Sequence, residues 1–287
     1  MHPFNPFRND PPDFAQVARR FPSLRPYLTF SKSDPSYAQI DFHDPRAARE
    51  LCYALMATKF NITLEIPLDS LIPPIPNRID YLLWCLDLSK ESEIASSQNE
   101  IWAIDVGTGC SCIYPLLGSR LDPRLRFVAI EVDERSAEYA QSNVEKNGLG
   151  GVIEVILNRD GPQYSTDILF PAAGIPYYSF AMCNPPFFRH PTDRLIKATL
   201  PSSTHSGSLT ETVVPGGEVA FVKRMFEESR DLKDRVRWWT SLLGKKEDLE
   251  TLKSVLRSEE VEVRTGRMRQ GRTVRWSIGW SWKVGTT

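Results

Sequence analysis

Asn184-Pro185-Pro186-Phe187 is the segment whose residue types are best suited to chemistry, and it follows a run of apolar residues. Two consecutive prolines fix φ and remove N–H donors, so the side-chain oxygen of Asn184 and the carbonyl of Pro185 can both accept hydrogen bonds from one external group. That group should be an amino group. Phe187 adds a flat face on which a planar ring can stack. The segment is therefore predicted to hold an amino group attached to a planar ring.

A second chemical signal is the turn Asp105-Val106-Gly107-Thr108-Gly109, which lies between a predicted strand and a predicted helix. Glycines let the backbone approach a ligand closely, and a helix N-terminus offers N–H donors. Cys112 stands where the third glycine of the dinucleotide fingerprint should be, which argues against NAD. Glu131 ends the next predicted strand, where a carboxylate can accept hydrogen bonds from both hydroxyls of an adenosine ribose. Asp105 can also serve as a helix-capping carboxylate.

The segments around these two signals alternate between strand and helix patterns. Strands are predicted at 101–106, 127–131, 152–157 and 179–183, with helices after the glycine turn and after Asp133. Later elements are predicted as a helix around 219–226, a strand at 236–243, a helix at 249–256 and a terminal hairpin of strands near 261 and 274–282. Alternating units of this kind predict a doubly wound, mostly parallel α/β sheet of the Rossmann-like type, ending in an antiparallel hairpin.

Residues 1–90 are expected to form a helical N-terminal extension, joined by a polar linker to an integrated α/β unit over residues 91–287. Asp44 can cap a helix, and alternating apolar residues over 62–66 predict a strand. Asn77 can cap the next helix.

The composition excludes several classes of protein. With 287 residues, 41% of them hydrophobic and 25% charged, the chain can bury a large core and is neither disordered nor collagen-like. No apolar run reaches the roughly 18 residues of a membrane span, and the N-terminus lacks a signal pattern, so the nucleus or cytoplasm is expected. Cysteine spacing predicts neither disulfides nor a metal site, and these residues are expected to be small buried hydrophobes: Cys52, Cys85, Cys110, Cys112 and Cys183.

Charge is unevenly distributed along the chain. Residues 223–287 hold 16 Lys and Arg against 10 Asp and Glu, whereas the preceding residues hold 19 against 26. A basic C-terminal quarter indicates either a polyanionic partner or a solvated surface with scattered charge. Residues 189–217 have no apolar periodicity and are too long for a passive connection, which predicts a lid over a site.

The chain resembles class I S-adenosylmethionine-dependent N-methyltransferases, because Asn184 to Phe187 is similar to the (Asp/Asn)-Pro-Pro-(Phe/Tyr) motif of enzymes that methylate planar or amide nitrogens. Across most of its length it resembles the methyltransferase-like protein 16 family, the adenosine-N6 methyltransferases of U6 small nuclear RNA. The similarity is carried by Pro11-Pro12-Asp13-Phe14 and by residues 66–84, 107–118, 182–188, 216–224, 237–246 and 270–276.

This resemblance implies S-adenosyl-L-methionine as cofactor, with Arg78 on its methionine carboxylate, Gly107 and Ser111 along that moiety, and Glu131 on the ribose. It implies that Asn184 lies at the transfer site. The candidate substrate-binding residues are Phe188, His205, Leu242, Lys245, Lys246, Arg267, Arg269 and Arg272. The basic members of this set are expected to contact RNA phosphates.

The expected function is thus methylation of adenosine N6 in structured RNA of the U6 type, by a monomer without a bound metal. The same resemblance includes a fungal offshoot, norbaeocystin methyltransferase, so a small aromatic amine is the alternative substrate. His205 matches that offshoot, whereas Leu242 stands where the offshoot carries Asn, and Lys245-Lys246 follows the RNA enzymes. A protein glutamine-N5 methyltransferase and a catalytically inactive RNA-binding module are the further alternatives.

Overall fold

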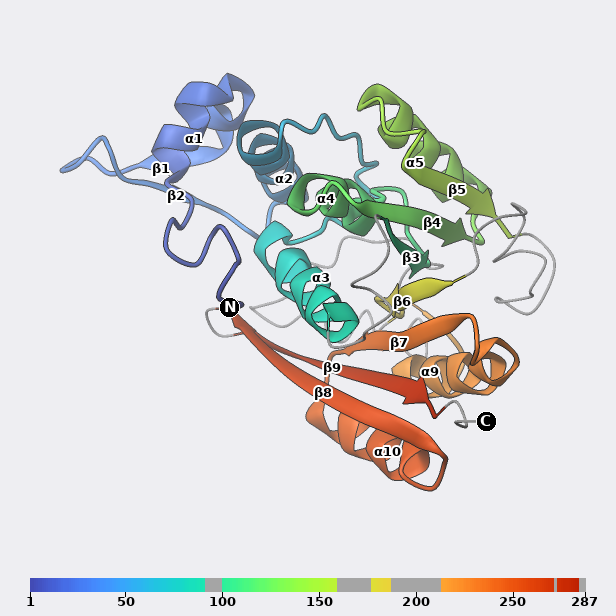
Figure 1. Ribbon diagram of the computed structural model, residues 1–287. Helices are drawn as coiled ribbons and strands as arrows, with labels where there is room; N and C mark the ends of the chain where they lie inside the picture. The colour runs from blue at the N-terminus through green and yellow to red at the C-terminus, as the bar shows by residue number, and fades with distance from the viewer. Residues whose placement is uncertain (91–99, 159–176, 187–212, 271–272, 284–287) are drawn as a thin grey trace.

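A seven-stranded sheet forms the centre of the computed structural model, which describes residues 1–90, 100–158, 177–186, 213–270 and 273–283. Its strand order is β5-β4-β3-β6-β7-β9-β8 (Figure 1). The strands are β3 (Ile101–Val106), β4 (Leu125–Glu131), β5 (Ile153–Leu157), β6 (Tyr178–Cys183), β7 (Val236–Leu243), β8 (Val261–Gln270) and β9 (Thr273–Trp282). Neighbouring strands from β5 to β7 are parallel, and β9 is antiparallel to both β7 and β8. The predicted doubly wound sheet and terminal hairpin are confirmed.

Helices cover both faces of this sheet (Figure 1). One face packs against α2, α3, α4 and α5, whose apolar side chains join those of the strands in the larger hydrophobic cluster. The other face packs against α9 and α10 in a second cluster. The helices are α2 (Pro45–Phe60), α3 (Ile75–Lys90), α4 (Ile113–Leu121), α5 (Glu134–Lys146), α9 (Gly217–Glu228) and α10 (Lys246–Leu256), with a short 3-10 helix, η3, at Ser229–Leu232.

The first ninety residues add α1 (Phe14–Arg20), the 3-10 helix η1 (Pro22–Tyr27) and a two-stranded antiparallel sheet of β1 (Leu28–Phe30) and β2 (Ala38–Ile40). These lie at one end of the molecule in Figure 1. Asp13 and Asp44 cap α1 and α2 by accepting hydrogen bonds from backbone N–H groups. Apolar residues of this part share the larger cluster with β3 and β4, so the extension and the sheet have a common core.

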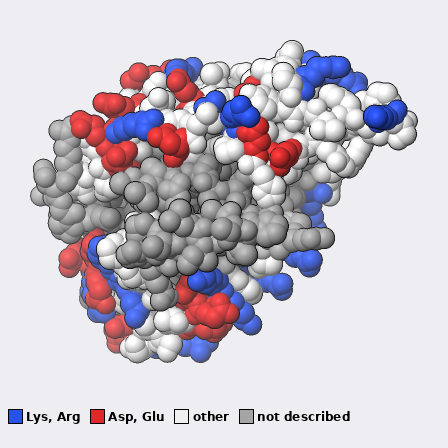
Figure 2. All heavy atoms as spheres, turned by 180° about the vertical axis from the view of Figure 1, so that it is seen from behind, with Lys and Arg blue, Asp and Glu red and all other residues white. Residues whose placement is uncertain are grey.

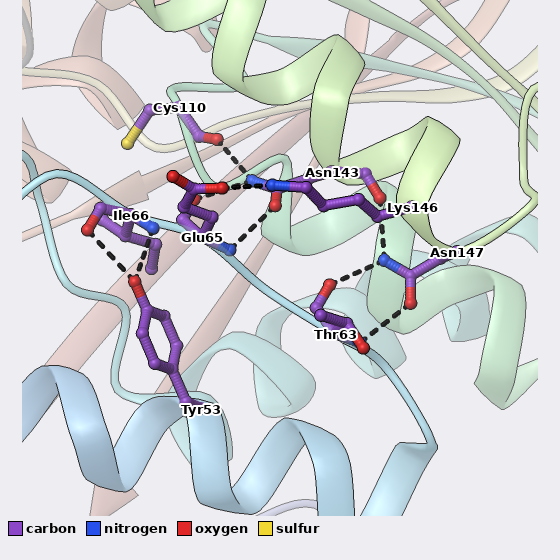
Figure 3. Close-up of polar contacts among 8 residues, drawn as sticks. All are labelled: Tyr53, Thr63, Glu65, Ile66, Cys110, Asn143, Lys146 and Asn147. Atoms are coloured by element: carbon purple, nitrogen blue, oxygen red, sulfur yellow. Dashed lines mark hydrogen bonds and ion pairs between the residues drawn. The ribbon is translucent and has the colours of Figure 1, made fainter.

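The strand predicted over residues 62–66 is wrong, although the alternation of buried residues is present. The segment is extended, but two asparagines of α5 take the place of a strand partner (Figure 3). Asn147 accepts from the Thr63 N–H at 2.8 Å and donates to its carbonyl at 2.7 Å. Asn143 makes the same pair of bonds with Glu65. The side-chain amides of Asn143 and Asn147 thus make the backbone hydrogen bonds that a neighbouring strand would make, although no strand is present there.

Asn77 does not cap the next helix, because α3 begins at Ile75. The Pro74 carbonyl accepts hydrogen bonds from the N–H groups of Asn77 and Arg78, so the first turn starts before Asn77. Arg78 consequently lies in the first turn of α3, next to the sheet.

All five cysteines are buried and none forms a disulfide, as their spacing predicted. Within the described ranges, the structure contains no helix that is both long and apolar enough to cross a membrane.

Gly118 of α4 should resist substitution, because an added Cβ would lie 2.6 Å from the ring of Phe127 on β4. That ring is fully buried and cannot turn away, so Gly118→Ala should lower the free energy of unfolding by about 1–3 kcal/mol despite the better helix propensity of alanine. Urea denaturation measures the change. Gly150→Ala is the matched control, because its Cβ would have no neighbour within 4 Å. Equal stability of the two variants would contradict this packing.

Candidate active site

The carboxyl ends of four parallel strands meet at one edge of the sheet. Val106 is paired with both Ile130 and Cys183, and Glu131 is paired with Leu157. The residues that follow these strands therefore gather at the same edge, as the sequence predicted for the glycine turn, Glu131 and Asn184.

The glycine turn has a different hydrogen-bond pattern from the one expected. Gly107 and Thr108 donate their N–H groups to the Ile130 carbonyl, and Gly109 donates to Glu131 Oε2 at 2.8 Å. These three N–H groups are engaged within the protein, and α4 begins later, at Ile113, so the donors expected at the helix N-terminus lie beyond the turn itself. Gly107 has φ of 69° and open space where a Cβ would lie, so the turn can still approach a ligand closely.

Glu131 is oriented by backbone groups. Its carboxylate accepts hydrogen bonds from the N–H groups of Gly109, Val132 and Asp133, at 2.8–3.0 Å. The residue is only 7% exposed. These bonds join the end of β4 to the glycine turn and hold the carboxylate at the edge where the sequence predicted it.

Asp105, at the buried end of β3, does not cap α4. Its Oδ2 accepts a hydrogen bond from the Thr108 hydroxyl at 2.8 Å, whereas its Oδ1 is buried without a hydrogen-bond partner among the described residues. Burial raises the pKa of Asp105 to about 7, and the nearby Glu131 carboxylate acts in the same direction. Asp105 therefore shapes the turn through Thr108 and carries a proton over part of the physiological pH range.

Arg78 reaches the same edge from α3. One guanidinium nitrogen donates to the Tyr114 hydroxyl at 3.2 Å, and the guanidinium lies 5.6 Å from the centre of that ring. Its Nε is buried and has no hydrogen-bond partner in the described part of the chain. Ser111 is also buried, between two buried cysteines. Arg78 thus has one guanidinium nitrogen without a described partner, and the roles predicted for Arg78 and Ser111 stay predictions.

Asn184 follows β6 directly, and Pro185 after it is buried. The Oδ1 of Asn184 is buried without a hydrogen-bond partner among the described residues. Four predicted residues, Phe187, Phe188, His205 and Arg272, lie outside the described ranges, as does most of the predicted lid.

Two residues that the sequence reasoning missed lie near this edge. Asn158 comes directly after β5, and its buried Nδ2 has no partner among the described residues. Arg275 of β9 is partly buried, and its pKa is lowered by burial and by the proximity of Arg78. The end of the third predicted strand was a usable signal for Asn158. A lone arginine in an otherwise apolar strand pattern was the signal for Arg275.

Four of the predicted basic residues, Lys245, Lys246, Arg267 and Arg269, lie at the same edge as Asn184. Because β9 is antiparallel to both neighbours, β8 runs in the direction of β7, and Leu243, Trp276 and Arg267 lie side by side across the three strands. Arg267 stacks on Trp276, with its guanidinium 5.5 Å from the ring centre. Exposed basic residues here are Lys245, Lys246, Arg267 and Arg269. Leu242, by contrast, is buried in the larger cluster.

Figure 2 shows both charge signs on the opposite side of the molecule from Figure 1. Lys and Arg side chains lie among Asp and Glu side chains there, rather than in one uninterrupted patch. The exposed Lys245, Lys246, Arg267 and Arg269 are four of the 16 Lys and Arg of the C-terminal quarter.

Four buried polar atoms without described partners lie at the carboxyl edge or on the first turn of α3: Arg78 Nε, Asp105 Oδ1, Asn158 Nδ2 and Asn184 Oδ1. Buried polar atoms are almost always hydrogen-bonded, so such a concentration indicates a place for a ligand. Arg78 Nε and Asn158 Nδ2 are donors, whereas Asn184 Oδ1 is an acceptor. This edge therefore offers both donors and an acceptor to a ligand.

Asp105→Asn should change how stability depends on pH. Between about pH 4 and pH 7 the unfolded chain has released the Asp105 proton while the folded chain still holds it. The free energy of unfolding of the wild type, relative to the variant, should therefore fall as pH rises through this window, by up to about 1.4 kcal/mol per unit, and level off above it. Denaturation at a series of pH values measures this difference. A difference that stays constant from pH 4 to pH 7 would contradict the raised pKa.

Comparisons with known proteins agree with this geometry. A family model described as "RNA methyltransferase" matches residues 1–284. The chain is 37% identical to the human RNA N(6)-adenosine-methyltransferase METTL16, over 98% of this chain and 50% of the relative. It is 34% identical to the U6 small nuclear RNA (adenine-(43)-N(6))-methyltransferase of Caenorhabditis elegans, over 98% of this chain and 62% of the relative.

Solved structures show the same relationship. The human METTL16 catalytic domain in complex with MAT2A 3′UTR hairpin 1 superposes with a TM-score of 0.87 at 37% identity, covering 98% of this chain and 95% of that one. The N-terminal domain of human METTL16 in complex with SAH superposes with a TM-score of 0.81 at 36% identity, covering 99% of each chain. The chain spans about half the length of most of the curated relatives it matches. By sequence and by fold, this chain belongs to the RNA methyltransferase family.

Proposed function

We propose that this chain is an S-adenosylmethionine-dependent methyltransferase that methylates adenosine N6 in structured RNA of the U6 small nuclear RNA type. The observation that carries the proposal is the buried, unpartnered Asn184 Oδ1 beside Pro185, at the edge where the glycine turn and Glu131 also lie. The names of the relatives support RNA as substrate, and they give no support to the small-amine alternative. A nuclear location follows from such a substrate.

The described residues provide a place for each part of the cofactor. Arg78 would bind the methionine carboxylate, and Gly107 with Ser111 would lie along that moiety. Glu131, held by three backbone N–H groups, would accept from the ribose hydroxyls, and Asn158 has an unpartnered donor for the heterocycle. When bound, S-adenosylmethionine supplies an electrophilic methyl group on its sulfonium.

Asn184 and Pro185 would orient the nucleophile. Their oxygens would accept the two hydrogens of the adenine N6 amino group and thereby aim the nitrogen at the methyl group. The adenine would be turned out of its stack, with Phe187 as the face on which it rests. A strong general base is not needed, because the N–H proton becomes acidic only as the new bond forms. Catalysis by these residues is mainly positioning.

The exposed Lys245, Lys246, Arg267 and Arg269 would hold RNA at the same edge. Contacts of this kind to phosphates position a nucleic acid without reading its sequence. They release condensed counterions, so binding should weaken as the salt concentration rises.

Asn184→Ala should reduce methyl transfer to RNA by 100-fold or more, because it removes an acceptor that aims the amino group. Turnover is measured with labelled S-adenosylmethionine and a U6-type RNA hairpin. Calorimetry with S-adenosylhomocysteine is the control, and the affinity should stay within a few-fold of wild type. Retention of more than about a tenth of wild-type turnover would refute the proposed role of Asn184.

Replacing both Arg267 and Arg269 by Glu should weaken RNA binding and lower the slope of log affinity against log salt, because two phosphate contacts are lost. Fluorescence anisotropy with a labelled hairpin at several salt concentrations measures both quantities. The control replaces Lys233 and Arg257 by Glu, which changes net charge equally near the other edge, before β7 and after α10. Equal effects of the two double variants would mean that net charge alone, rather than this edge, attracts RNA.

A further inference from the structure

β6 loses β7 as a partner just before Asn184, although it stays paired with β3 on its other side. The pairing of β6 with β7 ends at Ala181 and Trp239. Backbone groups of alternate residues in a strand point the same way, so the N–H and carbonyl of Cys183 face the β7 side together with those of Ala181. Beyond Ala181, β6 and β7 are not paired, so β7 provides no backbone partner for the N–H and carbonyl of Cys183. Cys183 directly precedes the predicted transfer motif.

A tyrosine hydroxyl from α3 takes the place of the missing strand. Tyr81 accepts a hydrogen bond from the Cys183 N–H at 3.3 Å, and its oxygen lies 3.2 Å from the Cys183 carbonyl oxygen. It is also 2.8 Å from the Thr240 hydroxyl, which donates to the Ala181 carbonyl at 3.0 Å. Burial raises the pKa of Tyr81 well above its ordinary value, so the hydroxyl keeps its proton and can donate it. The Tyr81 hydroxyl therefore accepts from the Cys183 N–H, and its single proton is shared between the Cys183 carbonyl and the Thr240 hydroxyl.

The ring of Tyr81 is held in place on both sides. It stacks on Trp84 at 6.2 Å between centres and meets Tyr114 edge to face at 5.6 Å. Tyr114 also accepts a hydrogen bond from Arg78, one helical turn before Tyr81. α3 can lie close to the sheet here because a Cβ on Gly279 would be only 3.2 Å from the ring of Trp84. The position of the hydroxyl is thus determined by packing.

We propose that Tyr81 is a positioning residue for methyl transfer, whose hydroxyl holds the end of β6 where it leaves β7 and so sets the direction of Asn184. This inference rests on the function proposed above. Cys183 and Asn184 share a peptide bond, so freedom at Cys183 becomes freedom at the amide that aims the substrate amino group. A displacement of about 1 Å at such a group can cost 100-fold in rate. Tyr81 is not one of the residues proposed to bind the cofactor, so its substitution should leave cofactor affinity unchanged.

Tyr81→Phe tests the proposal, because it removes the hydroxyl and keeps the ring. We expect kcat for RNA methylation to fall by about 10-fold or more, while affinity for S-adenosylhomocysteine stays within about two-fold. Tyr178→Phe is the matched control, since it removes the hydroxyl of another fully buried tyrosine at the opposite end of the same strand. Its kcat should remain near wild type. If Tyr81→Phe turned over as fast as Tyr178→Phe, the proposal would be wrong.

Amide hydrogen exchange provides a readout that does not depend on activity. In Tyr81→Phe the Cys183 N–H loses its acceptor, so its exchange, followed by NMR, should be faster than in both wild type and Tyr178→Phe. Unchanged exchange at Cys183 would overturn the proposal. A wild-type chain that did not methylate RNA would instead reject the proposed function, and the exchange experiment would still decide whether Tyr81 holds the strand end. If Tyr81→Phe fails to fold, Thr240→Val is the second variant: it removes the hydroxyl that joins Tyr81 to β7 but leaves Tyr81 as the acceptor of the Cys183 N–H. Its kcat should fall while exchange at Cys183 changes little, and an unchanged kcat would overturn the proposal.

Discussion

Every strand that ends at the carboxyl edge leaves backbone groups without a partner strand, and buried backbone groups must be hydrogen-bonded. The rest of the site depends on how these groups are satisfied. The Ile130 carbonyl accepts from Gly107 and Thr108, which bends the chain sharply after β3. Glu131 accepts from three N–H groups and joins that turn to β4. Tyr81 accepts a hydrogen bond from the Cys183 N–H at the end of β6. Asp105 Oδ1, Asn158 Nδ2 and Asn184 Oδ1 remain without a partner among the described residues after these bonds are made.

The same solution appears in the N-terminal part of the chain. Tyr53 of α2 accepts from the Ile66 N–H at 2.6 Å and donates to the Ile66 carbonyl at 3.1 Å (Figure 3). Tyr81 likewise accepts from the N–H of Cys183. Asn143 donates both to Glu65 and to the Cys110 carbonyl, so the extended segment is tied to the loop that leads into α4. The first ninety residues are therefore connected by hydrogen bonds, as well as by a shared core, to the turn proposed to bind the cofactor.

Burial makes the titratable groups of this edge sensitive to what binds there. Asp105 and Glu218 both have pKa values raised by burial, to about 7 and about 8. Glu218, in the first turn of α9, accepts from the Gly244 N–H at 2.9 Å and so joins α9 to the loop that leads from β7 to the exposed lysines. A positively charged ligand bound at this edge would favour the ionised form of either carboxyl group. Its binding would therefore be linked to the release of a proton.

Sequence patterns were sufficient to predict the order of strands and helices from residue 101 onward and the edge at which the predicted site lies. Apolar runs, glycine turns and caps such as Asp133 act locally, and parallel strands must end together, so no tertiary information was needed. The tertiary structure decided which polar groups were already engaged. Nothing in the sequence indicates that Gly107 donates to Ile130, that asparagines of α5 replace a strand at 62–66, or that Tyr81 bonds Cys183. These bonds join residues up to about a hundred positions apart, and they form only because packing of the helices on the sheet brings them together.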